Sequence, residues 1–232
     1  MSDKVTPIAG FTDPFSSITH LAASLVFLVL FYFLLRKAGK GHRFAVFIFG
    51  FACIFQLAIS GSYHLLDPGS GRNVLQRIDH AAIFFLIAAS FTPMHSILFQ
   101  GLSRWGMLLL VWVTAITGIT LKTIFFTSIP EWLGLIFFLG LGWLGVLSAV
   151  LLCRRFGLRY NRPLFLSGLS YTAGATLEFL HAPVIVERVI GPHELFHIAV
   201  ILGITFHWIY VYGFADGKVH ANTPHQYKIP GL

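Results

Sequence analysis

Histidine is the residue type through which this sequence can do chemistry. His193 and His197 are four residues apart, so on a helix they project from one face with Cβ atoms roughly 6 Å apart, and both imidazoles can bind one metal ion. His64 can supply a third nitrogen, and three histidines plus a water form a catalytic zinc site with an open position. Ser60 lies one turn before His64 and can hydrogen-bond a water at the metal. Asp79 is the nearest carboxylate by depth and can hold that water or take its proton.

The elements that position these residues must lie in a membrane. Of the 232 residues, 56% are hydrophobic and 11% are charged, and the mean hydropathy is +0.78, whereas a soluble domain carries roughly 25% charged residues. This composition excludes a water-soluble globule, a disordered chain and a coiled coil. The net charge of +7 does not indicate nucleic-acid binding, because basic residues in a membrane protein report which loops face the cytoplasm. The two cysteines form no CxxC motif, so neither a disulfide framework nor a thiolate metal site is expected.

Seven apolar stretches are long enough to cross the hydrocarbon core as helices, which takes about 20 residues each. They cover residues 15–35, 44–65, 78–99, 105–121, 132–152, 164–180 and 195–214. Turn and charge signals separate them, including residues 159–163 between the fifth and the sixth. The prediction is an all-α, integral membrane seven-transmembrane-helix bundle over residues 15–214 with an intramembrane zinc site. Residues 1–14 and 215–232 are expected to be tails.

Loop charge predicts the orientation of this bundle. By these spans, the side that holds the amino terminus carries five basic residues and the opposite side carries eleven. The positive-inside rule therefore places the amino terminus outside the cell and the carboxyl terminus in the cytoplasm.

Six of the eleven histidines fall in one leaflet when they are placed on alternating spans, together with Asp79 and Glu178. Any single membrane histidine is better explained by a hydrogen bond between helices. For the group this explanation weakens, because an ionisable side chain in the membrane costs several kcal/mol unless it finds a partner or water. The six therefore predict a functional site; they are His20, His64, His80, His181, His193 and His197.

Several neighbouring residues keep two interpretations. His20 and His80 either orient the metal ligands from outside or form interhelical hydrogen bonds. Glu178 and His181 are three residues apart, and pairing with each other is favoured over a role at the site. Glu194 completes the H-E-x-x-H pattern of zinc proteases, but a suitable downstream carboxylate ligand is missing. We therefore favour Glu194 as a solvated first-turn carboxylate that is stabilised by the helix dipole.

Three segments resemble the signature of the haemolysin III family, the bacterial branch of a superfamily that includes the adiponectin and progestin receptors and, more distantly, alkaline ceramidases. They are Ser60-Gly61-Ser62-Tyr63-His64, Arg77-Ile78-Asp79-His80 and His193-Glu194-Leu195-Phe196-His197. Thr19-His20 and Tyr171-Thr172-Ala173-Gly174 extend the resemblance over essentially the whole chain.

The resemblance implies a Zn²⁺ ion held by His64, His193 and His197, with Ser60 and Asp79 around a water at the metal. It also implies the cytoplasmic (inner) membrane of a bacterium. The receptor branch is described with a cytosolic amino terminus, whereas the loop charges here predict the reverse, as in the ceramidase branch. The metal site would then face the outer leaflet.

Two classes of function remain open. The first is a zinc-dependent hydrolase that cleaves an amide bond of a ceramide-like membrane lipid, with Asp79 as general base and Ser60 orienting the water or donating to the oxyanion. The second is a non-enzymatic protein in which zinc ties helices together while the chain senses lipid, maintains membrane properties or forms a haemolytic pore. Three histidines plus water favour catalysis over a closed four-ligand structural site. Membrane lipids are the expected partners in both cases, nucleic acid is not, and no oligomeric state is predicted.

Overall fold

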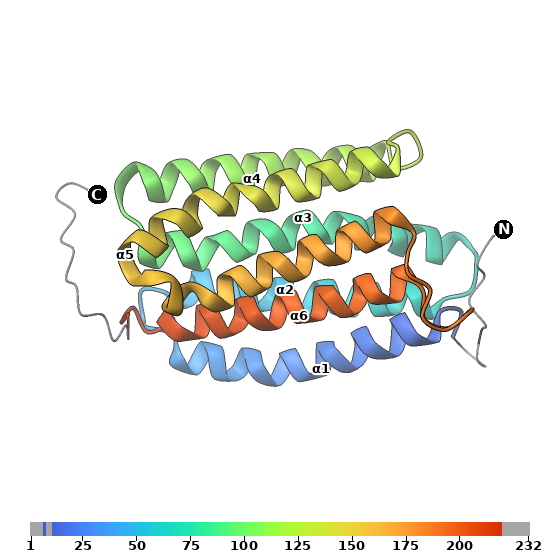
Figure 1. The fold of residues 1–232 in the computed structure, drawn as a ribbon, viewed down its shortest axis with the longest axis horizontal. Helices are drawn as coiled ribbons and strands as arrows, with labels where there is room; N and C mark the ends of the chain where they lie inside the picture. The colour runs from blue at the N-terminus through green and yellow to red at the C-terminus, as the bar shows by residue number, and fades with distance from the viewer. Residues whose placement is uncertain (1–6, 8–10, 220–232) are drawn as a thin grey trace.

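The computed structural model describes residue 7 and residues 11–219, and regular structure in this part of the chain is helical (Figure 1). The helices are α1 (Pro14–Lys37), α2 (Arg43–Leu65), α3 (Ser70–Leu98), α4 (Gly101–Ile124), α5 (Glu131–Leu180) and α6 (Pro192–Phe214). All six are long and apolar enough to cross a membrane. The prediction of an all-helical, multi-pass membrane protein is confirmed. Four residues used in the charge and histidine analysis lie outside the described part: Lys4, His220, His225 and Lys228.

Helix α5 contains both the fifth and the sixth predicted spans. It is 50 residues long, but Gly157 has φ 79° and ψ 162°, so two helical arms meet at this glycine. Figure 1 shows that the chain turns back at the bend, so that the two arms run in opposite directions rather than continuing in one line. The location of the break corrects the sequence-based prediction, because residues 159–163, expected to form the loop, are helical. The fifth and sixth predicted spans therefore belong to one helical element, α5, and not to two separate helices.

Gly157 and a buried side chain account for the bend. The backbone conformation of Gly157 is one that L-residues adopt only under strain. Asn161 is fully buried, and its Nδ2 donates to the carbonyl oxygens of Leu152 at 3.1 Å and Gly157 at 2.8 Å. These bonds satisfy backbone acceptors that the bend takes out of the helical ladder. The Tyr210 hydroxyl donates to Asn161 Oδ1 at 2.8 Å, which ties the bend to α6.

The outer surface of the bundle is apolar. Within α1, only 22% of the most hydrophobic window is buried inside the protein, and Leu102 on α4 is 85% exposed. The interior holds a compact cluster that includes Phe49, Leu57 and Phe214. Soluble monomers rarely expose apolar patches larger than a few hundred Å², so this surface fits contact with lipid chains.

Helices α1 and α2 approach closely at the end of the bundle that carries most of the histidines. A Cβ atom at Gly61 would lie 2.7 Å from Leu21 Cγ and 3.0 Å from Leu21 N, so only a hydrogen atom fits there. The Ser17 hydroxyl donates to the Gly61 carbonyl at 2.8 Å in the same contact. Small residues at such positions allow helices in a membrane to pack backbone against backbone. This contact brings the first turn of α1 beside the last turn of α2.

Candidate metal centre

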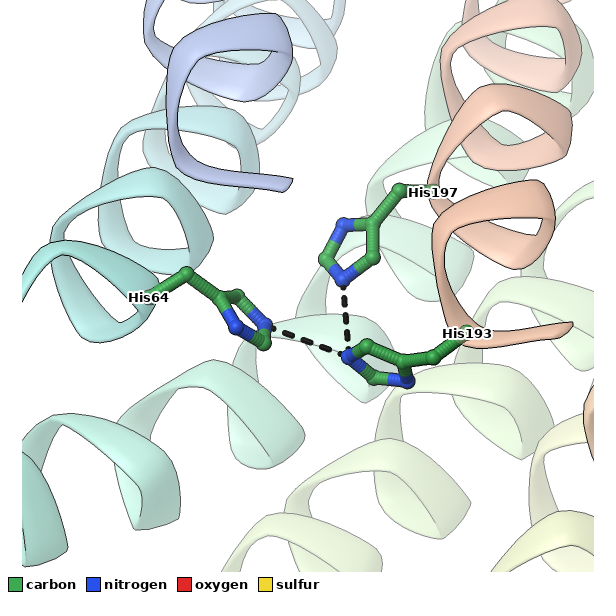
Figure 2. Close-up of side chains that lie close together, drawn as sticks. All are labelled: His64, His193 and His197. Atoms are coloured by element: carbon green, nitrogen blue, oxygen red, sulfur yellow. Dashed lines mark hydrogen bonds between the residues drawn. The ribbon is translucent and has the colours of Figure 1, made fainter. Parts of the chain in front are cut away.

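The three predicted ligands converge in space (Figure 2). His64 comes from the last turn of α2, and His193 and His197 come from the first two turns of α6. The Nε2 atom of His193 lies 3.4 Å from Nε2 of His64 and 3.0 Å from Nε2 of His197. Two nitrogens bound tetrahedrally to zinc at roughly 2.0–2.1 Å are about 3.3 Å apart, so this spacing fits one ion. One ligand atom from each residue lies within 4.8 Å of the others, so the three histidines can hold a metal ion.

Each imidazole turns its other nitrogen, Nδ1, toward a second partner. Nδ1 of His64 lies 2.9 Å from Asp13 Oδ2, and Nδ1 of His193 lies 3.0 Å from Glu178 Oε1. A carboxylate only accepts hydrogen bonds, so these two Nδ1 atoms carry the proton and the Nε2 lone pairs face the centre. His197 Nδ1 lies 2.9 Å from His20 Nε2. Partners of this kind fix the tautomer and orientation of metal-binding histidines.

Asp13 is held in place from several directions. It precedes α1 at the N-cap position, but its side chain does not cap the helix. Its Oδ2 instead accepts a hydrogen bond from the Arg72 guanidinium at 2.6 Å, and its backbone N–H donates to the His64 carbonyl at 3.0 Å. Burial raises the pKa of Asp13, but hydrogen bonds from His64 and Arg72 outweigh burial and hold the pKa below its usual value. The carboxylate is therefore ionised at neutral pH.

Ser60 and Asp79 lie together, buried, beside a third polar residue. Gln56 Nε2 donates to Asp79 Oδ1 at 3.0 Å, and the Ser60 side chain lies close to the same carboxyl group. Gln56, Ser60 and His64 follow one another at four-residue intervals, so one face of α2 leads from the Asp79 contact to the metal ligand. Gln56 Oε1 is buried and has no hydrogen-bond partner among the described residues, so it offers an acceptor to a ligand.

Two other histidines of this leaflet differ in what they contact. His20 contacts one of the predicted ligands, His197, in the position that an outer partner would occupy. His80 instead hydrogen-bonds the Gln76 carbonyl of its own helix at 2.8 Å and packs edge-on against Phe126.

Two sequence-based interpretations of glutamates are corrected. The Glu178 carboxylate pairs with His193, a residue distant in sequence, rather than with His181. Glu194 was expected to be solvated, but it is 3% exposed. Its expected location at the helix start is confirmed, because Glu194 Oε2 accepts from the Gly191 N–H at 2.9 Å and Oε1 accepts from the Ser16 hydroxyl at 3.3 Å.

Sequence reasoning missed Asp13, Arg72 and Gln56. An aspartate just before a helix is typical of an N-cap, so nothing local distinguishes Asp13 from an ordinary cap. Arg72 was read as part of a loop, whereas it lies in the first turn of α3. Gln56 did carry a signal, because it continues the four-residue spacing of Ser60 and His64.

The sequence is similar to those of known proteins over the residues that form this candidate centre. The family model described as "Haemolysin-III related" matches residues 10–208. The chain belongs to the haemolysin III-related family. The match includes every residue of the candidate metal centre from Asp13 to His197.

Three relatives show how far the similarity extends. The "Hemolysin-3 homolog" of Bacillus subtilis (strain 168) is 30% identical over 65% of this chain and 70% of its own length. "Hemolysin-3" of Bacillus cereus is 25% identical over 88% of this chain and 92% of its own. The "Heptahelical transmembrane protein 1" of Arabidopsis thaliana is 29% identical over 80% of this chain and 60% of its own.

Proposed function

We propose that this haemolysin III-related protein is a zinc-dependent hydrolase that cleaves an amide bond of a ceramide-like membrane lipid. The observation that carries the proposal is the convergence of three imidazole rings. The Nε2 atom of His193 lies 3.0 Å from that of His197 and 3.4 Å from that of His64, and each ring contacts a second partner through its Nδ1 atom. The donor set is all imidazole nitrogen, a set that suits Zn²⁺ and leaves a fourth position open. Bound zinc would polarise the lipid carbonyl and lower the pKa of water to about 7. The amide substrate follows from the resemblance to alkaline ceramidases.

The chain's own residues supply the remaining chemistry. Asp79 accepts the proton of the attacking water, and Gln56 holds the Asp79 carboxyl through the 3.0 Å hydrogen bond to Oδ1. Ser60 donates to the oxygen on which negative charge develops. His193 is the most exposed of the three ligands, with 43% of its side chain accessible, so the reacting lipid enters from its side.

We also propose how often the chain crosses the membrane and which way it faces. The two arms of α5 each cross the bilayer, which gives seven crossings, and the Arabidopsis relative carries the name "Heptahelical". The excess of basic residues at the opposite end supports an orientation in which the amino terminus and the metal centre face the outside of the inner membrane of a bacterium.

A non-enzymatic role is the second candidate. The printed names of the two Bacillus relatives refer to haemolysis, and the outer partners of all three ligands would equally suit a structural ion that ties α2 to α6. The chain would then sense lipid, maintain membrane properties or form a pore.

Metal content followed by turnover separates these candidates. Protein purified in detergent without chelator is analysed by inductively coupled plasma mass spectrometry, with His64→Ala and His193→Ala beside the wild type and His80→Ala as the matched control. We expect about one zinc per chain in the wild type and in His80→Ala, and none in the two ligand variants. Fatty-acid release from N-acyl sphingosines is then measured. Absence of zinc in the wild type refutes the hydrolase, and zinc without release favours the second candidate.

A further inference from the structure

A cavity lies at the end of the bundle opposite the candidate metal centre. It has a volume of about 540 Å³ and is bounded by the last turn of α3, the first turns of α4 and the first arm of α5. Figure 1 shows the α3–α4 connection and the bend of α5 at the end away from the first turns of α1 and α6. Ligand pockets in proteins span roughly 300–1,000 Å³, so this space is large enough for a lipid chain.

The walls of the cavity are apolar and open toward the lipid-facing surface. Leu102 from α4 and Leu147 and Leu151 from α5 line it, and all three side chains are exposed on the outside of the bundle. The polar groups on its floor are already satisfied. His95 Nδ1 lies 2.9 Å from the Ser103 carbonyl, and His95 Nε2 lies 2.9 Å from the Ser148 hydroxyl. An apolar occupant therefore displaces no hydrogen bond.

The mouth of the cavity carries a free positive charge. Arg104 Nε donates to the Phe99 carbonyl and Arg155 donates to the Leu98 carbonyl, both at 2.7 Å, so these two arginines are engaged at the end of α3. Arg154 also lines the cavity and is exposed, and no described residue forms a hydrogen bond or salt bridge with it.

The charged residues at this end of the bundle are almost all basic. Ten basic residues in the described part of the chain lie here by the predicted spans, and the only acidic residue with them is Asp216. Basic pockets between membrane helices typically bind the headgroups of anionic lipids.

We propose that this cavity binds one anionic phospholipid, with an acyl chain between α4 and the first arm of α5 and the phosphate on Arg154. The site is separate from the metal centre, and the proposal does not depend on zinc or on hydrolysis.

Native mass spectrometry of the detergent-purified full chain tests the proposal. The protein is titrated with dioleoylphosphatidylglycerol or dioleoylphosphatidylcholine, which share acyl chains and differ in headgroup charge. We expect one lipid to be retained, with the phosphatidylglycerol bound more tightly. Arg154→Gln should weaken phosphatidylglycerol binding roughly fivefold, the factor for one basic side chain near an anionic headgroup, and leave phosphatidylcholine binding unchanged. Arg159→Gln, an exposed arginine that does not line the cavity, is the matched control.

Filling the cavity provides an independent test. Gly106 lines it, and Gly106→Leu should abolish retention of both lipids, whereas Gly142→Leu, at an exposed glycine with open space around it, should bind like the wild type. If Gly106→Leu does not fold, Val150→Phe fills the cavity from the α5 wall. Equal losses in Arg154→Gln and Arg159→Gln, or normal retention in a folded cavity-filling variant, would overturn the proposal in favour of general attraction of lipids to a basic surface.

Discussion

Replacing Asp13 with asparagine should weaken zinc binding more than the same change at the other carboxylate partner, Glu178. Asp13→Asn keeps the side-chain shape but removes the charge that faces His64 Nδ1 at 2.9 Å. Loss of an outer partner typically costs 10–100-fold in metal affinity, or about 1.4–2.7 kcal/mol. We expect the upper part of this range, because Arg72, 2.6 Å from Asp13, would be left as an uncompensated cation close to a bound cation.

The loss of zinc affinity in Glu178→Gln should lie in the lower part of this range. The side chains of His193 and Glu178 are 43% and 36% exposed, whereas those of His64 and Asp13 are 4% and 19% exposed. The Glu178 pair is therefore less enclosed by protein than the Asp13 pair, and an exposed pair contributes less than a buried one.

Competition against a chromogenic zinc chelator at pH 7.5 measures these affinities on detergent-purified protein. Asp67→Asn is the matched control, because this nearby carboxylate accepts a hydrogen bond from Thr12 at 2.9 Å and is not a partner of the ligands. The Asp13→Asn/Arg72→Gln double variant should recover part of the lost affinity, since it removes the unpaired cation. Wild-type affinity in a folded Asp13→Asn variant would refute the role given to Asp13. An equal loss in Asp67→Asn would show that only general surface charge is involved.

Three further outcomes are expected. Asp79→Asn should retain zinc by mass spectrometry yet release no fatty acid from N-acyl sphingosines, because the change removes the proton acceptor and not a ligand. Zinc affinity should fall as the pH is lowered from 7.5 to 5.5 in a chelator titration, because protons compete with the metal for the imidazole nitrogens. Asp13, whose pKa is lowered, stays ionised in this window and keeps its stabilising contribution there. Gly157→Ala should destabilise the fold by about 1–3 kcal/mol in detergent unfolding experiments, since its φ of 79° strains any L-residue, whereas Gly142→Ala should leave stability unchanged or slightly raised. Equal stability of the two alanine variants would contradict the account of the bend.

Local patterns were sufficient to predict that His64, His193 and His197 converge and to place most helices. The four-residue spacing of His193 and His197 specifies one face of a helix, and the alternating direction of membrane helices places His64 at the same depth. The turn between the arms of α5 was placed too late because charge and proline mark residues 159–163, whereas the chain bends where glycine permits a positive φ. Asn161, assigned to the loop by its polarity, is instead the buried donor that satisfies the carbonyls at the bend.

The outer partners could not be read from the sequence, since their contacts are not local. Asp13 lies 51 positions from His64, and Glu178 lies 15 positions from His193, so helix spacing rules do not pair them. The three-residue interval between Glu178 and His181 is a plausible helix pairing, but α5 ends at Leu180 and His181 has a left-handed φ of 50°. The pairing rule for residues three apart applies only when both residues are on one helix, and His181 lies beyond the end of α5.

Two of the three candidate ligands are backed by carboxylates, an arrangement that would balance the charge of a bound zinc ion. Neutral imidazoles leave the two positive charges of a zinc ion uncompensated, and an isolated dication is costly where little water is present. Asp13 and Glu178 place two carboxylates one imidazole away from where such an ion would lie, and Arg72 offsets part of the Asp13 charge. The third candidate ligand, His197, is as buried as His64, and its Nδ1 faces a neutral partner, His20. An additional carboxylate behind His197 would have to be desolvated without a compensating charge, so a second imidazole is the less costly way to orient this ligand.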